Sequence, residues 1–169
     1  MRALVVYESM FGNTAAVANA VAEGLAGAFE VTLADVRERP PVAGVDLLVV
    51  GAPTHAFGLS RPSTRADAGK QGEVRAGARE TGIREYLDAA SPLAGLPVAA
   101  FDTRMDTRFP TGSAARKALR RLHGLGGQPV VPAEDFRVGG MTGPLVAGEI
   151  ERARRWARKV ADRHTSSAA

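Results

Sequence analysis

The feature that most constrains the fold is a strand, loop and helix pattern in residues 3–28. Residues 3–7 form an apolar, β-branched run with almost no polar alternation, which is typical of a strand buried on both faces of a parallel sheet. After Thr14 the spacing of apolar residues becomes helical, with valine or leucine at positions 17, 21 and 25. Because such a strand needs helices on both sides, the pattern predicts an α/β protein whose first helix begins near Asn13.

The loop between this strand and this helix is rich in small polar residues. They are Ser9, Gly12, Asn13 and Thr14. The first N–H groups of a helix have no partner within the helix, and the helix dipole attracts negative charge there. With hydroxyl donors from Ser9 and Thr14, the loop predicts a phosphate site. The plain alternative is a helix N-cap formed by Asn13 and Thr14 in an α/β protein without a ligand.

Two common phosphate-binding motifs are absent from the sequence. The triphosphate form G-x-x-x-x-G-K-[ST] does not occur, since Gly69 and Lys70 are followed by Gln71. The dinucleotide form G-x-G-x-x-G does not occur either. A compact monophosphate therefore fits the loop better than a nucleoside triphosphate with magnesium or a dinucleotide.

The loop resembles the phosphate loop of the flavodoxin family, whose usual form is S/T-x-T/Y-G-N-T directly after the first strand. In this chain it reads Ser9-Met10-Phe11-Gly12-Asn13-Thr14. Phe11 departs from the usual pattern and removes one hydroxyl group from the phosphate site, while the backbone N–H groups remain. The resemblance implies that the whole loop binds the phosphate of FMN.

Further strand and helix patterns alternate along the rest of the chain. Strands are predicted at residues 29–34, 45–50 and 97–101, and an interrupted fifth strand at 128–132 and 136–138. Helices are predicted after residue 63 and at residues 83–90, 113–124 and 145–164. The long segment of residues 60–82 has no sustained period and is a candidate wall of a binding site.

This alternation implies a parallel sheet with right-handed crossovers. The resemblance covers essentially the whole chain. It implies a flavodoxin-like, three-layer, doubly wound α/β fold with a five-stranded parallel sheet in the order 2-1-3-4-5 and helices on both faces. A length of 169 residues favours a single domain, residues 1–164, followed by a frayed tail at residues 165–169.

A second polar loop follows the third predicted strand, at the same edge of the sheet as the first. It includes Pro53-Thr54-His55-Ala56-Phe57-Gly58. The resemblance implies that this loop holds the flavin, with Phe57 over one face of the isoalloxazine ring and Thr54 on the ribityl chain or the phosphate. Gly58 would permit a peptide flip beside the ring, because glycine accepts a positive φ at little cost. His55 either contacts the flavin or donates a proton to it, or is a loop histidine bonded to backbone.

A third polar loop is expected from Asp102 to Phe109 and beyond. The resemblance implies that Asp102, Thr103 and Arg104 hold the pyrimidine end of the flavin through backbone amides, and that Phe109 covers its outer face. The residues themselves also allow structural roles. Phe109 would then be a packed loop anchor, and Asp102 would be a structural cap or the partner of a nearby arginine. No catalytic residue and no metal ligand is assigned.

Composition narrows the chemistry and the partners. The chain has no cysteine, so any redox reaction depends on a cofactor. No apolar stretch approaches the ~20 residues of a membrane span, and the N-terminus lacks a leader pattern, so we expect a cytoplasmic protein. The net charge of +4 comes without a nucleic-acid recognition motif. Because most flavodoxins are acidic, a basic one needs different docking electrostatics, which favours an acidic partner protein.

The resemblance implies an FMN-binding redox protein that performs electron transfer or a small flavin-dependent reduction. Its electron acceptor would be a redox partner protein or a small molecule. The carrier role is slightly favoured, because no nicotinamide site and no acid–base pair is evident in the sequence. A flavin-free binding or interaction module with the same fold is the alternative, since fold alone does not decide function.

Overall fold

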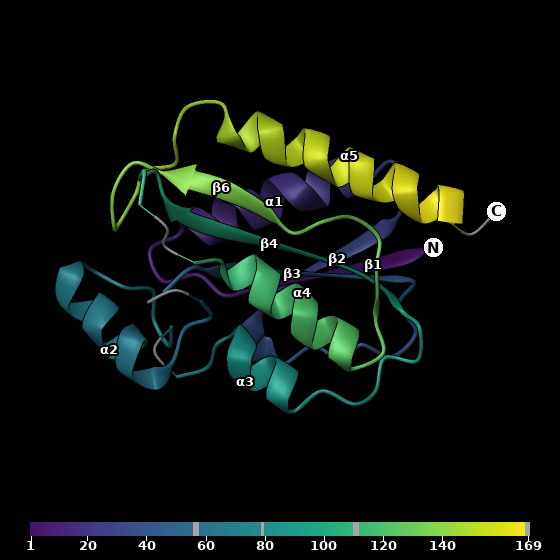
Figure 1. The fold of residues 1–169 in the computed structure, drawn as a ribbon, viewed down its shortest axis with the longest axis horizontal. Coiled ribbons are helices and arrows are strands. Elements are labelled where there is room, and N and C mark those ends of the chain that lie inside the picture. The colour runs from purple at the N-terminus through teal and green to yellow at the C-terminus, as the bar shows by residue number, and fades with distance from the viewer. Residues whose placement is uncertain (56–57, 79, 110–111, 168–169) are drawn as a thin grey trace.

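The strands form one parallel sheet at the centre of the molecule (Figure 1). The computed structural model describes residues 1–55, 58–78, 80–109 and 112–167. Within these residues the sheet has six strands in the order β2-β1-β3-β4-β5, and β6 also pairs with β4. They are β1 (Arg2–Tyr7), β2 (Glu30–Asp35), β3 (Leu47–Pro53), β4 (Pro97–Met105), β5 (Gln128–Pro129) and β6 (Glu134–Val138). This arrangement confirms the predicted strand order 2-1-3-4-5.

The predicted fifth strand is interrupted, as its sequence indicates. β5 pairs with the start of β4, and β6 pairs with the second half of β4, from Phe101 onward. Proline has no N–H group to donate to a ladder, and Pro132 lies between the two pieces.

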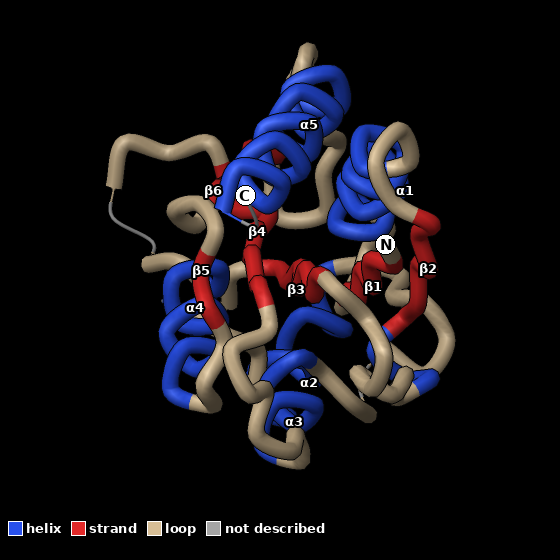
Figure 2. Tube along the Cα trace, turned by 90° about the vertical axis from the view of Figure 1, so that its right-hand side faces the viewer, coloured by secondary structure: helices blue, strands red, loops and turns tan. Residues whose placement is uncertain are grey.

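Helices cover both faces of the sheet (Figure 2). On one face lie α1 (Asn13–Leu25) and α5 (Glu149–Ser167). On the other lie α2 (Pro62–Gln71), α3 (Ile83–Asp88) and α4 (Ala114–Gly124), and a short 3-10 helix spans Val36–Glu38. None of the helices in the described part of the chain has both the length and the apolar character that a membrane crossing needs.

The buried side chains form two clusters, one on each face of the sheet. On β1, Leu4 and Val6 belong to one cluster, whereas Ala3 and Val5 belong to the other. Each of these four side chains is at most 1% exposed. The first strand is therefore buried on both faces, as predicted from its apolar sequence.

The third polar loop begins later than predicted. β4 continues to Met105, and Asp102, Thr103 and Arg104 pair with β6 inside the sheet. Asp102 and Thr103 also pair with β3 on the other side. The prediction ended this strand at residue 101, where the apolar run stops, whereas the buried polar residues that continue it find hydrogen-bond partners in distant segments.

The last helix is shifted along the chain relative to the prediction. α5 begins at Glu149 and ends at Ser167, instead of spanning residues 145–164. Leu145 forms an antiparallel bridge with Val138 at the end of β6, which uses the start of the predicted helix for pairing with the sheet.

Three aromatic rings connect β4 and β6 to α5. Phe101, Phe136 and Trp156 pack edge to face, with centroid distances of 5.9, 6.1 and 6.2 Å. Gly51 of β3 lies opposite Phe101 in the sheet. A Cβ atom on Gly51 would lie 2.1 Å from the Phe101 ring, so the missing side chain makes room for the central ring of the cluster.

We predict that Gly51→Ala lowers the free energy of unfolding by about 1–3 kcal/mol, because the added methyl group overpacks the core against Phe101. Urea unfolding measures this difference. Gly27→Ala is the matched control, since a Cβ atom on the exposed Gly27 meets no heavy atom within 4 Å. We expect that control to change stability by less than about 0.5 kcal/mol. Equal losses in the two variants would contradict a steric role for Gly51.

Candidate functional site

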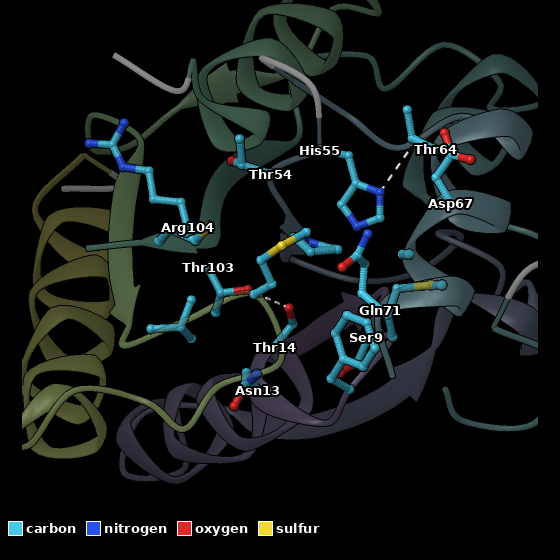
Figure 3. Close-up of a pocket in the computed structure, with 17 residues that line it drawn as sticks. Ser9, Asn13, Thr14, Thr54, His55, Thr64, Asp67, Gln71, Thr103 and Arg104 are labelled. Carbon is cyan, nitrogen blue, oxygen red and sulfur yellow. Dashed lines mark hydrogen bonds between the residues drawn. The ribbon is translucent and has the colours of Figure 1, made fainter. Parts of the chain in front are cut away.

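A cavity of about 440 Å³ lies where β1, β3 and β4 end at one edge of the sheet (Figure 3). Its volume is in the range of small-molecule sites. The three predicted loops all contribute to its lining. The contributing residues are Ser9, Met10, Phe11, Asn13 and Thr14 from the first, Pro53, Thr54 and His55 from the second, and Thr103 and Arg104 from the third. The structure thus brings together most of the residues predicted from the sequence.

The first loop turns tightly from β1 into α1. Gly12 has a φ of +96°, a left-handed conformation that glycine adopts without steric penalty. Ser9 Oγ accepts hydrogen bonds from the N–H groups of Gly12 and Ala15, at 3.1 and 3.2 Å. A hydroxyl has two lone pairs and one proton, so Ser9 keeps its proton to donate to an anion in the cavity that it lines.

Two contacts tie the first loop to distant segments. The hydroxyl groups of Thr14 and Thr103 lie 2.7 Å apart in a buried hydrogen bond between α1 and β4 (Figure 3). Asn13 Nδ2 donates to the carbonyl of Thr142, at 3.1 Å. A loop held at both points is preorganised, which reduces the conformational entropy that ligand binding costs.

One wall of the cavity is α2, which lies within the segment of residues 60–82 that the sequence analysis gave as a candidate wall, although no residue of it was predicted as a site residue. It contributes Thr64, Asp67, Ala68 and Gln71. Their spacing places them on one helical face, but they are small or polar and therefore make no apolar stripe. Downstream of α2, the Arg75 N–H donates to the Met10 carbonyl at 2.9 Å. Phe11 lies 3.7 Å from the position of a Cβ atom on Gly72, so it contacts the end of α2.

His55 connects the second loop to α2. Its Nδ1 is 3.3 Å from the Thr64 hydroxyl (Figure 3), and its backbone N–H and C=O both pair with Gly58 at 2.8 Å. Burial, with a smaller contribution from the charge of Arg65, lowers the pKa of His55 to about 4. The imidazole is therefore neutral near pH 7, which suits contact with a ligand better than a cationic proton donor. The predicted contacts of Ala56 and Phe57 lie outside the described residues.

The Asp102 carboxylate does not line the cavity, but it holds residues beside the cavity in place through hydrogen bonds. It is fully buried, and Oδ2 accepts hydrogen bonds from Thr54 Oγ1, Ser113 Oγ and the Ala115 N–H, at 3.1, 2.7 and 3.0 Å. Burial raises the pKa of Asp102 above its usual value. The Asp102 side chain therefore caps the start of α4 and binds Thr54, as the structural alternative predicted, and its hydrogen bonds go to these groups instead of to an arginine.

The outer end of β4 carries Arg104, which lines the cavity. Its guanidinium donates to the Gly112 carbonyl at 3.0 Å and to the Asp135 carboxylate at 2.9 Å. Phe109 is 81% exposed, so it is not a packed loop anchor, and it does not line the cavity. Contact between Phe109 and a flavin stays a prediction.

Three apolar lining residues outside α2 were also missed by the sequence reasoning. They are Met105, Val138 and Met141. Val138 ends β6, which reaches the cavity because it pairs with the end of β4, and Met141 follows it. The predicted strand order already pairs residues 136–138 with the fourth strand, but no local pattern shows that these side chains reach the cavity.

A buried carboxyl group directly precedes the first loop. Glu8 is 2% exposed, and its Oε1 accepts a hydrogen bond from the Ile83 N–H at 2.8 Å. Burial raises the pKa of Glu8 to about 7, against the opposite effects of hydrogen bonds to Ser60 and Ile83 and of the Arg65 charge. Glu8 therefore joins the end of β1 to the segments that begin α2 and α3.

We predict that Glu8 makes the wild-type protein less stable as the pH rises from about 4.5 to about 7. The unfolded chain loses the Glu8 proton near pH 4.5, whereas the folded protein keeps it to about pH 7, so the folded state binds more protons in this window. The loss is on the order of 3 kcal/mol. Glu8→Gln cannot ionise, so its stability relative to wild type rises across the same window, as urea unfolding at several pH values would measure.

Glu30→Gln is the control for this prediction, because Glu30 is an exposed carboxylate on β2. We expect its unfolding free energy to follow the wild-type pH profile. The same profile for wild type and Glu8→Gln between pH 4.5 and 7 would show that Glu8 does not carry this proton.

The chain is similar to known proteins in sequence family and in fold. The flavodoxin family model matches residues 5–156. A flavodoxin from the domain Archaea has a TM-score of 0.70 at 20% identity, with 98% of this chain and 99% of that chain covered. Oxidised flavodoxin 1 from Bacillus cereus has a TM-score of 0.68 at 17% identity, with 96% and 98% covered. A WrbA-like flavodoxin from Agrobacterium tumefaciens has a TM-score of 0.64 at 20% identity, with 98% of each chain covered.

At these identities the solved structures show the fold alone. No curated protein sequence matches the chain significantly. The family model, in contrast, spans most of the 169 residues. The strand order, the loop from Ser9 to Thr14 and this match agree, and the chain belongs to the flavodoxin family.

Proposed function

We propose that this protein binds FMN in the cavity at the carboxyl edge of the sheet and carries electrons. Flavodoxins transfer electrons to partner proteins, and membership of the family supports a flavin redox role. The observation that carries the choice of FMN is the convergence of the loop from Ser9 to Thr14 and the N-terminus of α1 on a cavity of about 440 Å³.

The residues at the α1 end of the cavity fit a phosphate dianion. No acidic residue lies in the first turn of α1, so the helix dipole and the backbone N–H groups attract an anion without an opposing carboxylate. The space beside Gly12 is open, since a Cβ atom there would meet no heavy atom within 4 Å. Ser9 adds a hydroxyl donor, and the Thr14 and Thr103 pair lies next to it in the lining.

The rest of the cavity fits a flat, largely apolar ring with polar edges. Apolar surface comes from Met10, Pro53, Ala68, Met105, Val138 and Met141. Asp67, Gln71 and Arg104 supply polar groups at its margin. Since the chain has no cysteine, bound FMN supplies the redox chemistry, while the protein binds and orients it.

In this proposal different groups of the predicted residues contact different parts of FMN. The loop from Ser9 to Thr14 holds the phosphate, and Pro53, Thr54, His55, Thr103 and Arg104 contact the ribityl chain and the ring. Contacts from Ala56, Phe57, Gly58, Asp102 and Phe109 remain predictions from the family resemblance. The location in the cytoplasm is likewise a proposal.

We predict that titration with FMN produces the visible absorption bands of bound flavin, and that Ser9→Ala weakens FMN binding about tenfold. A hydrogen bond to a charged group contributes about 1.5–3 kcal/mol, and 1.4 kcal/mol corresponds to tenfold in affinity. Riboflavin lacks the phosphate, so its affinity should be the same for wild type and Ser9→Ala. Ser91→Ala, which changes an exposed serine, is the control and should bind both flavins like wild type.

Absence of flavin binding at micromolar concentrations would overturn the proposal and favour the flavin-free interaction module. An equal loss of FMN and riboflavin affinity in Ser9→Ala would assign Ser9 to the conformation of the loop instead of to the phosphate.

A small flavin-dependent reduction is the second candidate function. The α2 face with Asp67 and Gln71 favours it, because a polar wall over the cavity is able to hold a small substrate beside the ring. Steady-state assays with NAD(P)H and quinones distinguish the two functions. A reductase turns over with a small acceptor alone, whereas a carrier requires a protein partner.

A further inference from the structure

Three of the six arginine and lysine residues of α5 form ion pairs within the fold, whereas Arg155, Lys159 and Arg163 are exposed and take part in no ion pair among the described residues. Ion pairs join Arg152 to Glu134 and Glu149, Arg154 to Glu23 and Glu151, and Arg158 to Glu151. These arginines hold α5 to β6, to α1 and to its own neighbouring turns. Their charges are therefore used inside the molecule.

The basic residues of α4 differ from the unpaired cations of α5 in their position, because the start of α4 lies beside the cavity. Arg116, Lys117 and Arg120 are exposed, and α4 contains no aspartate or glutamate. Spacings of three and four residues place the three cations side by side on one face. Within the described residues none of the three takes part in an ion pair, whereas Arg121 on the same helix pairs with Asp88.

These cations lie beside the cavity. The Ala114 N–H at the start of α4 donates to Thr54 Oγ1 at 3.0 Å, and Thr54 lines the cavity. Lys117 extends over the second loop, where its Nζ would be 2.7 Å from a Cβ atom on Gly58. The positive face therefore begins at the loop that borders the cavity and continues along α4, on the side of the sheet opposite α5 (Figure 2).

Two more exposed cations lie at the carboxyl edge of the sheet. Arg61 directly precedes α2, and Arg108 lies in the loop after β4. Neither takes part in an ion pair within the part of the chain that the structure describes. We define the cationic face as Arg116, Lys117 and Arg120 on α4, with Arg61 and Arg108 as further cations at the carboxyl edge of the sheet, where the exposed Asp106 also lies.

Exposed apolar side chains occur at the same edge. Met105, Phe109 and Met141 are 41%, 81% and 56% exposed, and Met1 is the one other large hydrophobic residue exposed among those described. Met105 and Met141 line the cavity, and Phe109 lies in the loop that follows Met105. Protein interfaces are enriched in aromatic residues, methionine and arginine, with a polar rim around an apolar centre.

We propose that an acidic redox protein docks on the cationic face, with Met105 and Phe109 at the centre of the contact. The inference rests on the proposed function, because docking there brings the partner to the flavin cavity. Complementary charge accelerates the encounter and fixes the orientation of the partner. A protein suits this edge better than a nucleic acid, because one exposed aromatic ring, Phe109, offers little surface for base stacking.

The test measures association of the FMN-loaded protein with a plant-type [2Fe–2S] ferredoxin, an acidic electron-transfer protein, at about 20 mM and about 200 mM NaCl. The variant is Lys117→Glu with Arg120→Glu. The control is Arg155→Glu with Lys159→Glu on α5, two exposed cations away from the cavity. Each substitution lowers the charge by two, so both double variants have a formal net charge of 0 instead of +4.

We expect the association rate at low salt to fall about tenfold in the α4 variant and less than about twofold in the α5 control. Wild-type association should weaken at the higher salt concentration. Equal losses in the two variants would show that net charge alone matters and would overturn the proposal. So would an unchanged rate in the α4 variant, or wild-type association that is absent or insensitive to salt.

Two further probes test the class of partner. Tighter binding of cytochrome c, a basic protein, than of the ferredoxin would overturn the proposal. A short DNA duplex or phosphatidylserine vesicles that bind more tightly than the ferredoxin, and that lose this binding in the α4 variant, would overturn the proposal. The partner would then be a nucleic acid or a membrane surface instead of a protein. FMN titration of each variant is run separately, so failure of flavin binding is distinguished from failure of docking.

Discussion

The parallel pairing of strands that are buried on both faces is the constraint on which the rest of this structure depends. Leu4 and Val6 need one layer of helices, and Ala3 and Val5 need the other. Since β1, β3 and β4 are parallel, the chain leaves all three at the same edge and has to return across a face. The cavity lies at this edge, beside the point where the strand order reverses between β1 and β3.

Buried polar groups then determine the shape of that edge. A polar group that loses water on folding needs a hydrogen-bond partner, so each one joins the segments that supply it. The Thr14 and Thr103 hydroxyls join α1 to β4, and Asp102 joins β4 to the second loop and to α4. The parts of the cavity lining that come from α1, from β4 and from the second loop are thereby fixed relative to each other. Glu8 joins the end of β1 to the start of α3 by accepting a hydrogen bond from the Ile83 N–H, and its burial there raises its pKa.

Particular residues show how far prediction from the sequence reached. The first strand, the start of the first helix near Asn13 and the strand order were predicted correctly, because each depends on spacing within one segment or on the family pattern. Asp102 was predicted to lie in a loop but belongs to β4. Its hydrogen-bond partners Ser113 and Ala115 lie at the start of α4, so the neighbouring sequence does not show that this carboxylate is satisfied inside the sheet. Met141 was missed, since nothing near it in the sequence shows that it lies by the cavity.

The sequence by itself determined most of the local elements, the polar loop after the first strand and the net charge of +4. Helical periodicity, capping chemistry and composition are properties of neighbouring residues or of the whole chain, so they need no knowledge of contacts. Only the tertiary structure decided which residues of α2 line the cavity and which basic residues form ion pairs. Ion pairs such as Arg154 with Glu23 join residues far apart in the chain. The physical reason is that burial, pairing and pKa depend on which distant segments meet.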